Sequence, residues 1–76
     1  MLLVAAVPGR WYVIKSIRDS SVRRQAMYLG MGEGEEVYCC EKTGDGPVIL
    51  SRSGQLVAVG TKTARDILVA PKKSAE

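Results

Sequence analysis

The 76-residue sequence contains no histidine. Histidine is the commonest general base in enzymes and the commonest protein ligand for transition metals. Its absence excludes a catalytic triad, and a serine or cysteine nucleophile would need another base. Four glutamates, Glu33, Glu35, Glu36 and Glu41, gather around one predicted strand, as charges commonly do at strand ends. We therefore predict that the chain is not an enzyme, with no catalytic residues and no cofactor.

Cysteine is also scarce, and its two copies, Cys39 and Cys40, are adjacent. Neighbouring residues on a strand point to opposite faces, so a disulfide between them would be strained. For the same reason the pair cannot hold one ion from one face. We expect one core and one surface cysteine, a reducing compartment and no metal site. Adventitious metal binding by Cys40, or its joining of two subunits, is left open.

Long apolar runs are missing as well. Residues 1–7 are apolar, but no basic segment precedes them and Pro8 interrupts the run, unlike a signal peptide. No stretch approaches the roughly 20 apolar residues of a transmembrane helix. We expect a soluble, cytoplasmic protein that reaches the inner face of the membrane only through a partner.

Phenylalanine is absent, and the net charge of +3 comes from charges whose signs mostly alternate along the chain. Small barrels that bind nucleic acid usually interleave basic residues with stacking aromatic side chains. Only Trp11, Tyr12, Tyr28 and Tyr38 are available here. Nucleic-acid binding is therefore an alternative that we do not expect.

What the sequence does contain is a series of short strand patterns. Residues 10–17 are rich in aromatic and β-branched types, which favour strands. Alternation places Tyr12 and Ile14 on the core face and Trp11 on the other face. Strict alternation would turn Ile17 outward, so we predict a β-bulge just before it.

A short helix is predicted after this strand. Asp19, Ser20 and Ser21 offer side-chain oxygens to cap the helix. Val22, Ala26 and Leu29 then follow at i, i+4 and i+7 as one apolar stripe. Gly30 then stands where a helix end requires a positive φ. So short a helix must pack on the sheet to persist.

The rest of the chain predicts four more strands and a helical turn. The strands are expected at 35–42, 48–52, 55–59 and 67–69, with the turn at 61–65. Short strands with brief turns in one small domain indicate an all-β fold, a closed or nearly closed barrel. We expect this barrel to occupy residues 1–70, followed by a flexible polar C-terminal tail at 71–76.

Several motifs resemble a known family in order and spacing. They are Val7-Pro8-Gly9, Tyr12-Val13-Ile14 with Ile17, the run from Arg23 to Met31, Gly34, Gly44-Asp45-Gly46-Pro47-Val48, Val57-Ala58-Val59-Gly60, and Ala64, Ile67 and Val69. Over about residues 2–70 the chain resembles the ferrous iron transport protein A (FeoA) family. The sequence departs from the family pattern at Glu33, where proline is frequent, and at Arg52, where a hydrophobic residue is usual.

The resemblance implies an SH3-like β-barrel and a cytoplasmic accessory role in ferrous iron uptake. Family members are thought to act on the membrane transporter FeoB, which carries a G-protein domain on its cytoplasmic side. The family has no agreed catalytic residues. A FeoB-type transporter is thus the expected partner; the alternatives are a nucleic-acid-binding barrel and a transition-metal-binding module. Weak self-association is left open.

We place the expected partner contact on the helix and the turn that follows it. Arg23, Arg24, Tyr28 and Met31 combine basic and large apolar side chains at one end of the short helix. Trp11, predicted to face outward, is a further candidate, since an exposed tryptophan is typical of protein contacts. In the competing interpretation, Tyr28 and Met31 simply cover the mouth of the barrel, and Trp11 belongs to the core.

Overall fold

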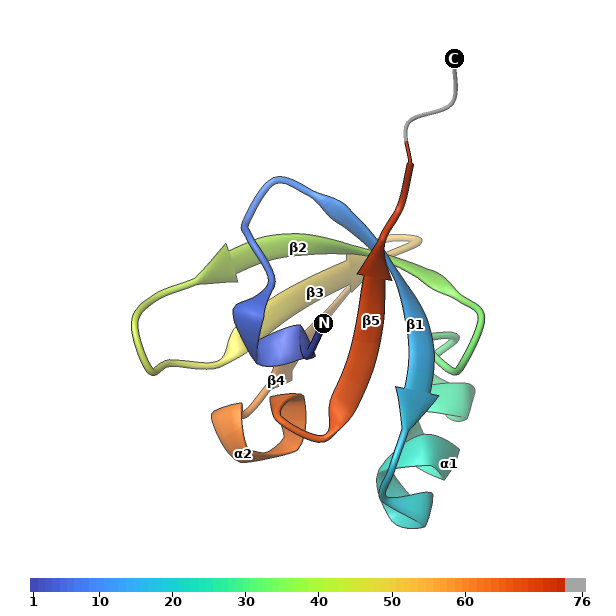
Figure 1. Cartoon of the computed structure of the whole chain (residues 1–76). Coiled ribbons are helices and arrows are strands. Elements are labelled where there is room, and N and C mark those ends of the chain that lie inside the picture. The colour runs from blue at the N-terminus through green and yellow to red at the C-terminus, as the bar shows by residue number, and fades with distance from the viewer. Residues whose placement is uncertain (74–76) are drawn as a thin grey trace.

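A computed structural model describes residues 1–73 of the chain. Its five strands and three short helices follow one another along the chain (Figure 1). They are η1 (Leu3–Ala5), β1 (Trp11–Ile17), α1 (Ser20–Tyr28), β2 (Glu36–Lys42), β3 (Val48–Arg52), β4 (Gln55–Val59), α2 (Thr61–Ala64) and β5 (Ile67–Pro71). Apart from η1, every element coincides with a predicted one to within two residues at either end.

The strands form one antiparallel sheet in the order β4-β3-β2-β1-β5. Figure 1 shows the sheet strongly curved, with β1 and β5 in front of β3 and β4. Buried side chains from all strands except β4 meet between these two halves. The all-β, SH3-like barrel is therefore confirmed, with α2 connecting the two end strands, β4 and β5, which do not pair.

Strand β1 explains how the barrel is filled. Tyr12, Ile14 and Ile17 are each at most 2% exposed, as predicted. The register against β5 shifts between Ile14 and Ser16, which is the expected bulge and returns Ile17 to the core. The buried Tyr12 hydroxyl accepts a 2.8 Å hydrogen bond from the N–H of Val7, so the polar end of this ring is satisfied.

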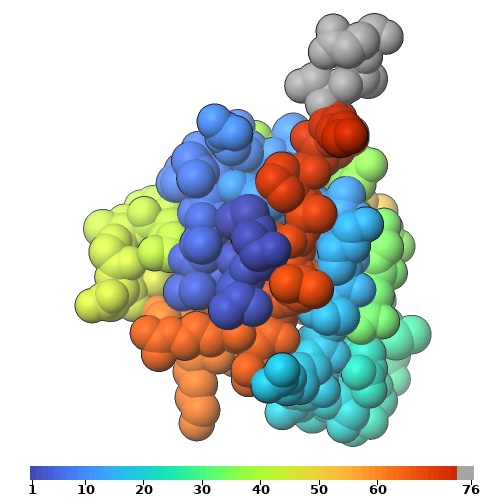
Figure 2. Space-filling model, in the orientation of Figure 1, coloured from blue at the N-terminus to red at the C-terminus, as the bar shows by residue number. Residues whose placement is uncertain are grey.

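The N-terminal segment protects one edge of the sheet. Leu2 forms an isolated bridge with Leu68 of β5, and the N–H of Val69 donates to the carbonyl oxygen of Met1 at 2.7 Å. Figure 2 shows this segment lying directly against β5. The opposite edge of the sheet, on β4, has no neighbouring strand among the described residues.

The last strand is longer than predicted. β5 runs to Pro71 rather than ending at Val69, and the N–H of Lys72 donates to the carbonyl oxygen of Trp11 at 2.9 Å. Pairing with β1 holds this part of the chain, a tertiary contact that local sequence patterns do not report. Of the tail predicted at 71–76, residues 74–76 lie outside the described residues. Within the described part, no helix is long and apolar enough to cross a membrane.

Candidate protein-interaction surface

Helix α1 begins at a side-chain cap. The Asp19 carboxylate accepts hydrogen bonds from the N–H groups of Ser21 and Val22, at 2.8 and 3.1 Å. These are donors that an α-helix cannot satisfy internally. The cap confirms the predicted start of the helix and assigns it to Asp19, the first of the three candidate residues.

Two side chains hold the end of β1 beside α1. Arg23 Nη1 donates to the carbonyl oxygen of Ile17 at 2.9 Å, and Glu33 Oε2 accepts from the N–H of Ile17 at the same distance. Arg23 therefore positions the helix, and its guanidinium is not simply a free surface charge. Glu33, one of the two departures from the family pattern, thus accepts a hydrogen bond from the main chain at the end of β1.

The C-terminal end of α1 is a Schellman motif. The N–H of Met31 donates to the carbonyl oxygen of Ala26 at 2.8 Å, and the N–H of Gly30 donates to that of Met27 at 3.1 Å. Gly30 has φ +73°, a conformation that costs glycine little. The motif turns the chain sharply and carries Met31 inward.

Met31 corrects one part of the predicted contact surface. Its side chain is 4% exposed and belongs to the hydrophobic core. It cannot touch a partner unless the core opens. The sequence places Met31 in the turn after the helix, but the direction in which the Schellman turn sends its side chain depends on how the helix packs on the barrel.

The exposed side of α1 carries Arg24, Met27 and Tyr28, which together we call the α1 surface. Tyr28 is 89% exposed and Met27 is 67% exposed. Arg24 lies one turn before Tyr28, on the same side of the helix. The surface thus presents two large apolar side chains beside a cation, on a helix whose two ends are both fixed.

An apolar hollow of about 210 Å³ lies next to α1. Val22, Ala26 and Leu29, the predicted stripe, line one side, and Val57 and Val59 of β4 line the other. None of the described residues that line it is charged. The stripe is therefore only partly covered by the barrel, and a partner's apolar side chain would find an uncharged recess there.

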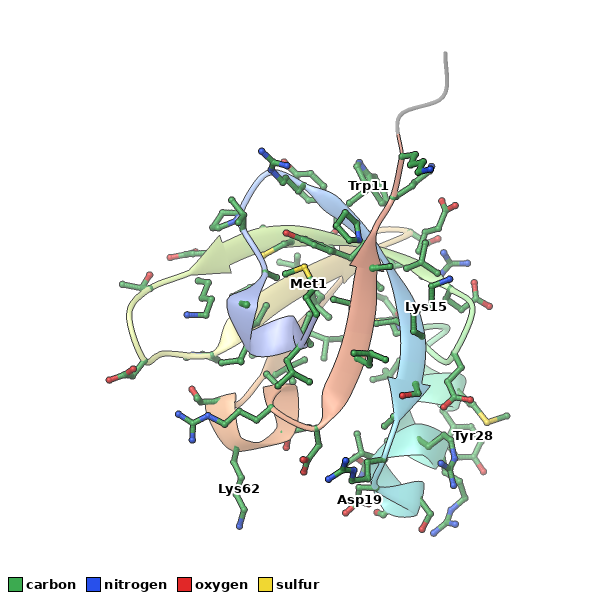
Figure 3. The ribbon with its side chains drawn as sticks, in the orientation of Figure 1. Met1, Trp11, Lys15, Asp19, Tyr28 and Lys62 are labelled. Atoms are coloured by element: carbon green, nitrogen blue, oxygen red, sulfur yellow. The ribbon has the colours of Figure 1, made fainter. Side chains whose placement is uncertain are left out.

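Trp11 faces outward as predicted, but it lies far from α1. The labelled Trp11 and Tyr28 stand near opposite ends of the molecule in Figure 3. Trp11 is 46% exposed, its ring centre is 5.3 Å from that of Tyr38, and Lys72 Nζ lies 5.6 Å from it. Lys72 also pairs with Glu36 at 3.0 Å. The structure thus separates the predicted residues into the α1 surface and a distinct aromatic cluster.

The two cysteines offer no built metal site. Cys39 is fully buried and Cys40 is half-buried, in line with one core thiol and one nearer the surface. Burial, and next the neighbouring Cys40, raise the pKa of the Cys39 thiol, which favours the neutral form over the metal-binding thiolate. No group of three potential ligands occurs among residues 1–73.

Met27 was not included in the predicted contact surface, and the hollow was not predicted from the sequence. Met27 lies outside the apolar stripe of the helix, and an apolar residue in that position could have been recognised as an exposed contact residue. The hollow had no such signal, because it arises where the helix stands off from β4, a distance that no local pattern encodes.

Comparison with known proteins gives a consistent result. A family model described as "FeoA domain" matches residues 1–71. A crystal structure described as iron uptake regulatory protein (FeoA) has a TM-score of 0.82 at 23% identity, over 95% of this chain and 97% of that one. Comparison with curated proteins gave no match.

Two further solved structures share the fold. The crystal structure of Stenotrophomonas maltophilia FeoA, described as complexed with zinc and as a candidate ferrous iron transport activating factor, has a TM-score of 0.76 at 24% identity, over 92% of this chain and 89% of that one. The solution structure of FeoA from Chlorobium tepidum has a TM-score of 0.83 at 24% identity, over all of this chain and 74% of that one.

Proposed function

Because the chain belongs to the FeoA family, as the match over residues 1–71 shows, we propose that it is a non-enzymatic accessory protein that regulates ferrous iron uptake by binding the cytoplasmic side of a FeoB-type transporter. The family is linked to ferrous iron transport. Contact with the transporter and a cytoplasmic location go beyond that link and are our proposal.

The observation that carries the proposal is the α1 surface. Exposed tyrosine, methionine and arginine are types enriched in protein interfaces. Here Tyr28 and Met27 are the most exposed large apolar side chains of α1. The Asp19 cap and the Gly30 turn hold the helix that presents them, so little ordering would be required on binding.

The neighbouring hollow supports the same surface. It lies along the side of α1 that faces the barrel, and its lining carries no charge among the described residues. A partner that grips α1 would place apolar side chains in the hollow and acidic groups near Arg24. We therefore propose a transporter segment that combines apolar anchors with negative charge.

The test is calorimetric binding to the purified cytoplasmic domain of the transporter from the same genome, with and without GTP. Saturable binding that Tyr28→Ala weakens about tenfold or more would support the proposal, since interface anchors typically contribute that much. Undiminished binding by a variant with both Tyr28→Ala and Arg24→Glu would place the contact elsewhere. No binding to any part of the transporter would refute the accessory role.

Two matched controls are available. Lys15→Glu makes the same charge change as Arg24→Glu at an exposed position on the β1 bulge, and Trp11→Ala removes an aromatic side chain far from α1 (Figure 3). Both variants should bind like the natural protein. If Trp11→Ala instead abolished binding and Tyr28→Ala did not, the aromatic cluster would be the contact surface.

A further inference from the structure

The outer edge of β4 is an unused pairing surface. β4 is the end strand of the sheet, and no strand lies beside it among the described residues. Strand edges left unpaired are ready templates for another strand. At the other end of the sheet, β5 is covered by Met1 and Leu2.

The register shows which groups are free on this edge. Ser53 and Gly54, with φ of 51° and 83°, form a two-residue hairpin turn, so Arg52 and Gln55 are a hydrogen-bonded pair. Hydrogen-bonded and non-bonded pairs alternate in an antiparallel ladder. The N–H and C=O groups of Leu56 and Ala58 therefore point away from β3.

The edge also lacks the usual protection against pairing. The five residues Gln55–Val59 include no charge, no proline and no glycine, and their pairing with β3 has no register shift. Proteins commonly blunt exposed edges with lysine, proline or a bulge. Leu56, in addition, is 70% exposed.

We propose that two copies of this chain associate through antiparallel pairing of their β4 strands, with Val57 on the two-fold axis. Leu56 of each copy then lies opposite Ala58 of the other, and each such pair exchanges two hydrogen bonds. The large Leu56 side chain meets the small Ala58 side chain on the outer face. No charged residue of either strand meets another, although each copy carries a net charge of +3.

A second copy fits this edge better than an unrelated peptide, because the pattern is self-complementary. Leu56 ends an outer-face row that runs from Trp11 through Tyr38 and Ser51. Across the proposed axis the row continues onto Ala58 and Ile49 of the second copy. A contact confined to one strand is small, so we expect a weak, reversible dimer.

Sedimentation equilibrium from micromolar to millimolar concentration tests the proposal. Ala58→Pro removes an N–H that points away from β3, so the hydrogen bonds between β4 and β3 are kept. In a two-fold dimer the substitution removes one intermolecular hydrogen bond from each copy. We expect it to raise the dissociation constant about tenfold or more. Leu56→Lys should act in the same direction, by placing a charge on the edge. Tyr28→Lys makes the same kind of change on α1 and should leave the dimer unchanged.

Amide hydrogen exchange supplies an independent readout that requires no variant. Protection of the Leu56 and Ala58 amides should rise with protein concentration, while that of Val57, already paired with β3, should not. Salt should tighten the dimer, because it screens repulsion between two positive copies. A monomer throughout the concentration range, or a dimer that Leu56→Lys leaves intact, would overturn the proposal. The proposal does not rest on transporter binding, but Ala58 also lines the hollow beside α1, so the dimer and a partner that fills the hollow would compete for this edge.

Discussion

The main-chain N–H of Ile17 donates a 2.9 Å hydrogen bond to Oε2 of Glu33 and thereby joins the end of β1 to the connection that precedes β2. The carbonyl oxygen of the same residue accepts from Arg23 of α1. The last residue of β1 is thus satisfied on both sides by charged side chains. The orientation of α1 on the barrel depends on this arrangement.

Replacing Glu33 tests that dependence. Glu33→Ala leaves the Ile17 N–H without its charged acceptor, so we expect the free energy of unfolding to fall by about 1–3 kcal/mol. Glu33→Gln keeps an acceptor oxygen and should lose less. Urea denaturation measures both. Glu41→Ala, at an exposed position, is the control and should be nearly neutral. An equal loss of unfolding free energy in all three variants would contradict the role of Glu33 as the acceptor for the Ile17 N–H.

Gly30 and Gly60 form a matched pair for backbone conformation. Gly30 has φ +73°, whereas Gly60 precedes α2 at φ −61° with open space around an added Cβ. Gly30→Ala should destabilise the protein by about 1 kcal/mol, because alanine is strained at positive φ. Gly60→Ala should cost less, because alanine adopts this φ without strain and loses only the preference for glycine at the N-cap of α2. Thermal unfolding compares them, and a reversed order would contradict the Schellman assignment.

The hydroxyl of Tyr12 ties the N-terminal segment to the core through the N–H of Val7. Tyr12→Phe should cost about 1 kcal/mol, the contribution of one buried hydrogen bond. The Val7 amide should also exchange faster with solvent. Tyr28→Phe is the control, because the Tyr28 ring is 89% exposed. An unchanged Val7 exchange rate would mean that the bond does not hold the segment.

Stability should fall at alkaline pH through Cys39. Burial raises the pKa of this thiol in the folded state, while an unfolded thiol titrates near pH 8.5. The unfolded chain therefore loses its proton first. The stabilising contribution is complete below about pH 8.5 and is lost as pH rises toward the higher folded pKa. Cys39→Ala should reduce the fall of the unfolding free energy with pH, as measured by denaturation at a series of pH values. If the fall is unchanged in this variant, other groups cause it.

The strands could be predicted because their signals are local. Alternation placed Tyr12 and Ile14 inside, and both are at most 2% exposed. The bulge before Ile17 followed from the failure of strict alternation at one position. The run from Asp19 to Ser21 and Gly30 marked the two ends of α1, through capping chemistry that acts within a few residues.

The candidate site was less predictable, because exposure depends on contacts between distant segments. Met31 was expected at the surface of the turn that follows the helix, but this turn carries its side chain into the core. Arg23 was placed on the contact surface, but its guanidinium donates to the carbonyl oxygen of Ile17. Arg52, a departure from the family pattern, forms a 2.8 Å ion pair with Glu35. The two residues are too far apart in the sequence for a helix or strand period to predict this contact.

The sequence alone determined the family, the all-β class, the order of the elements and the side of each strand that faces the core. These depend on period-two patterns, turn residues and caps, which act over short stretches of chain. Only the tertiary structure decided that α1 stands off from β4 around an apolar hollow, that Trp11 and Tyr28 lie apart, and that β4 keeps a free edge while Met1 and Leu2 cover β5. Those relationships arise from how the curved sheet brings distant residues together.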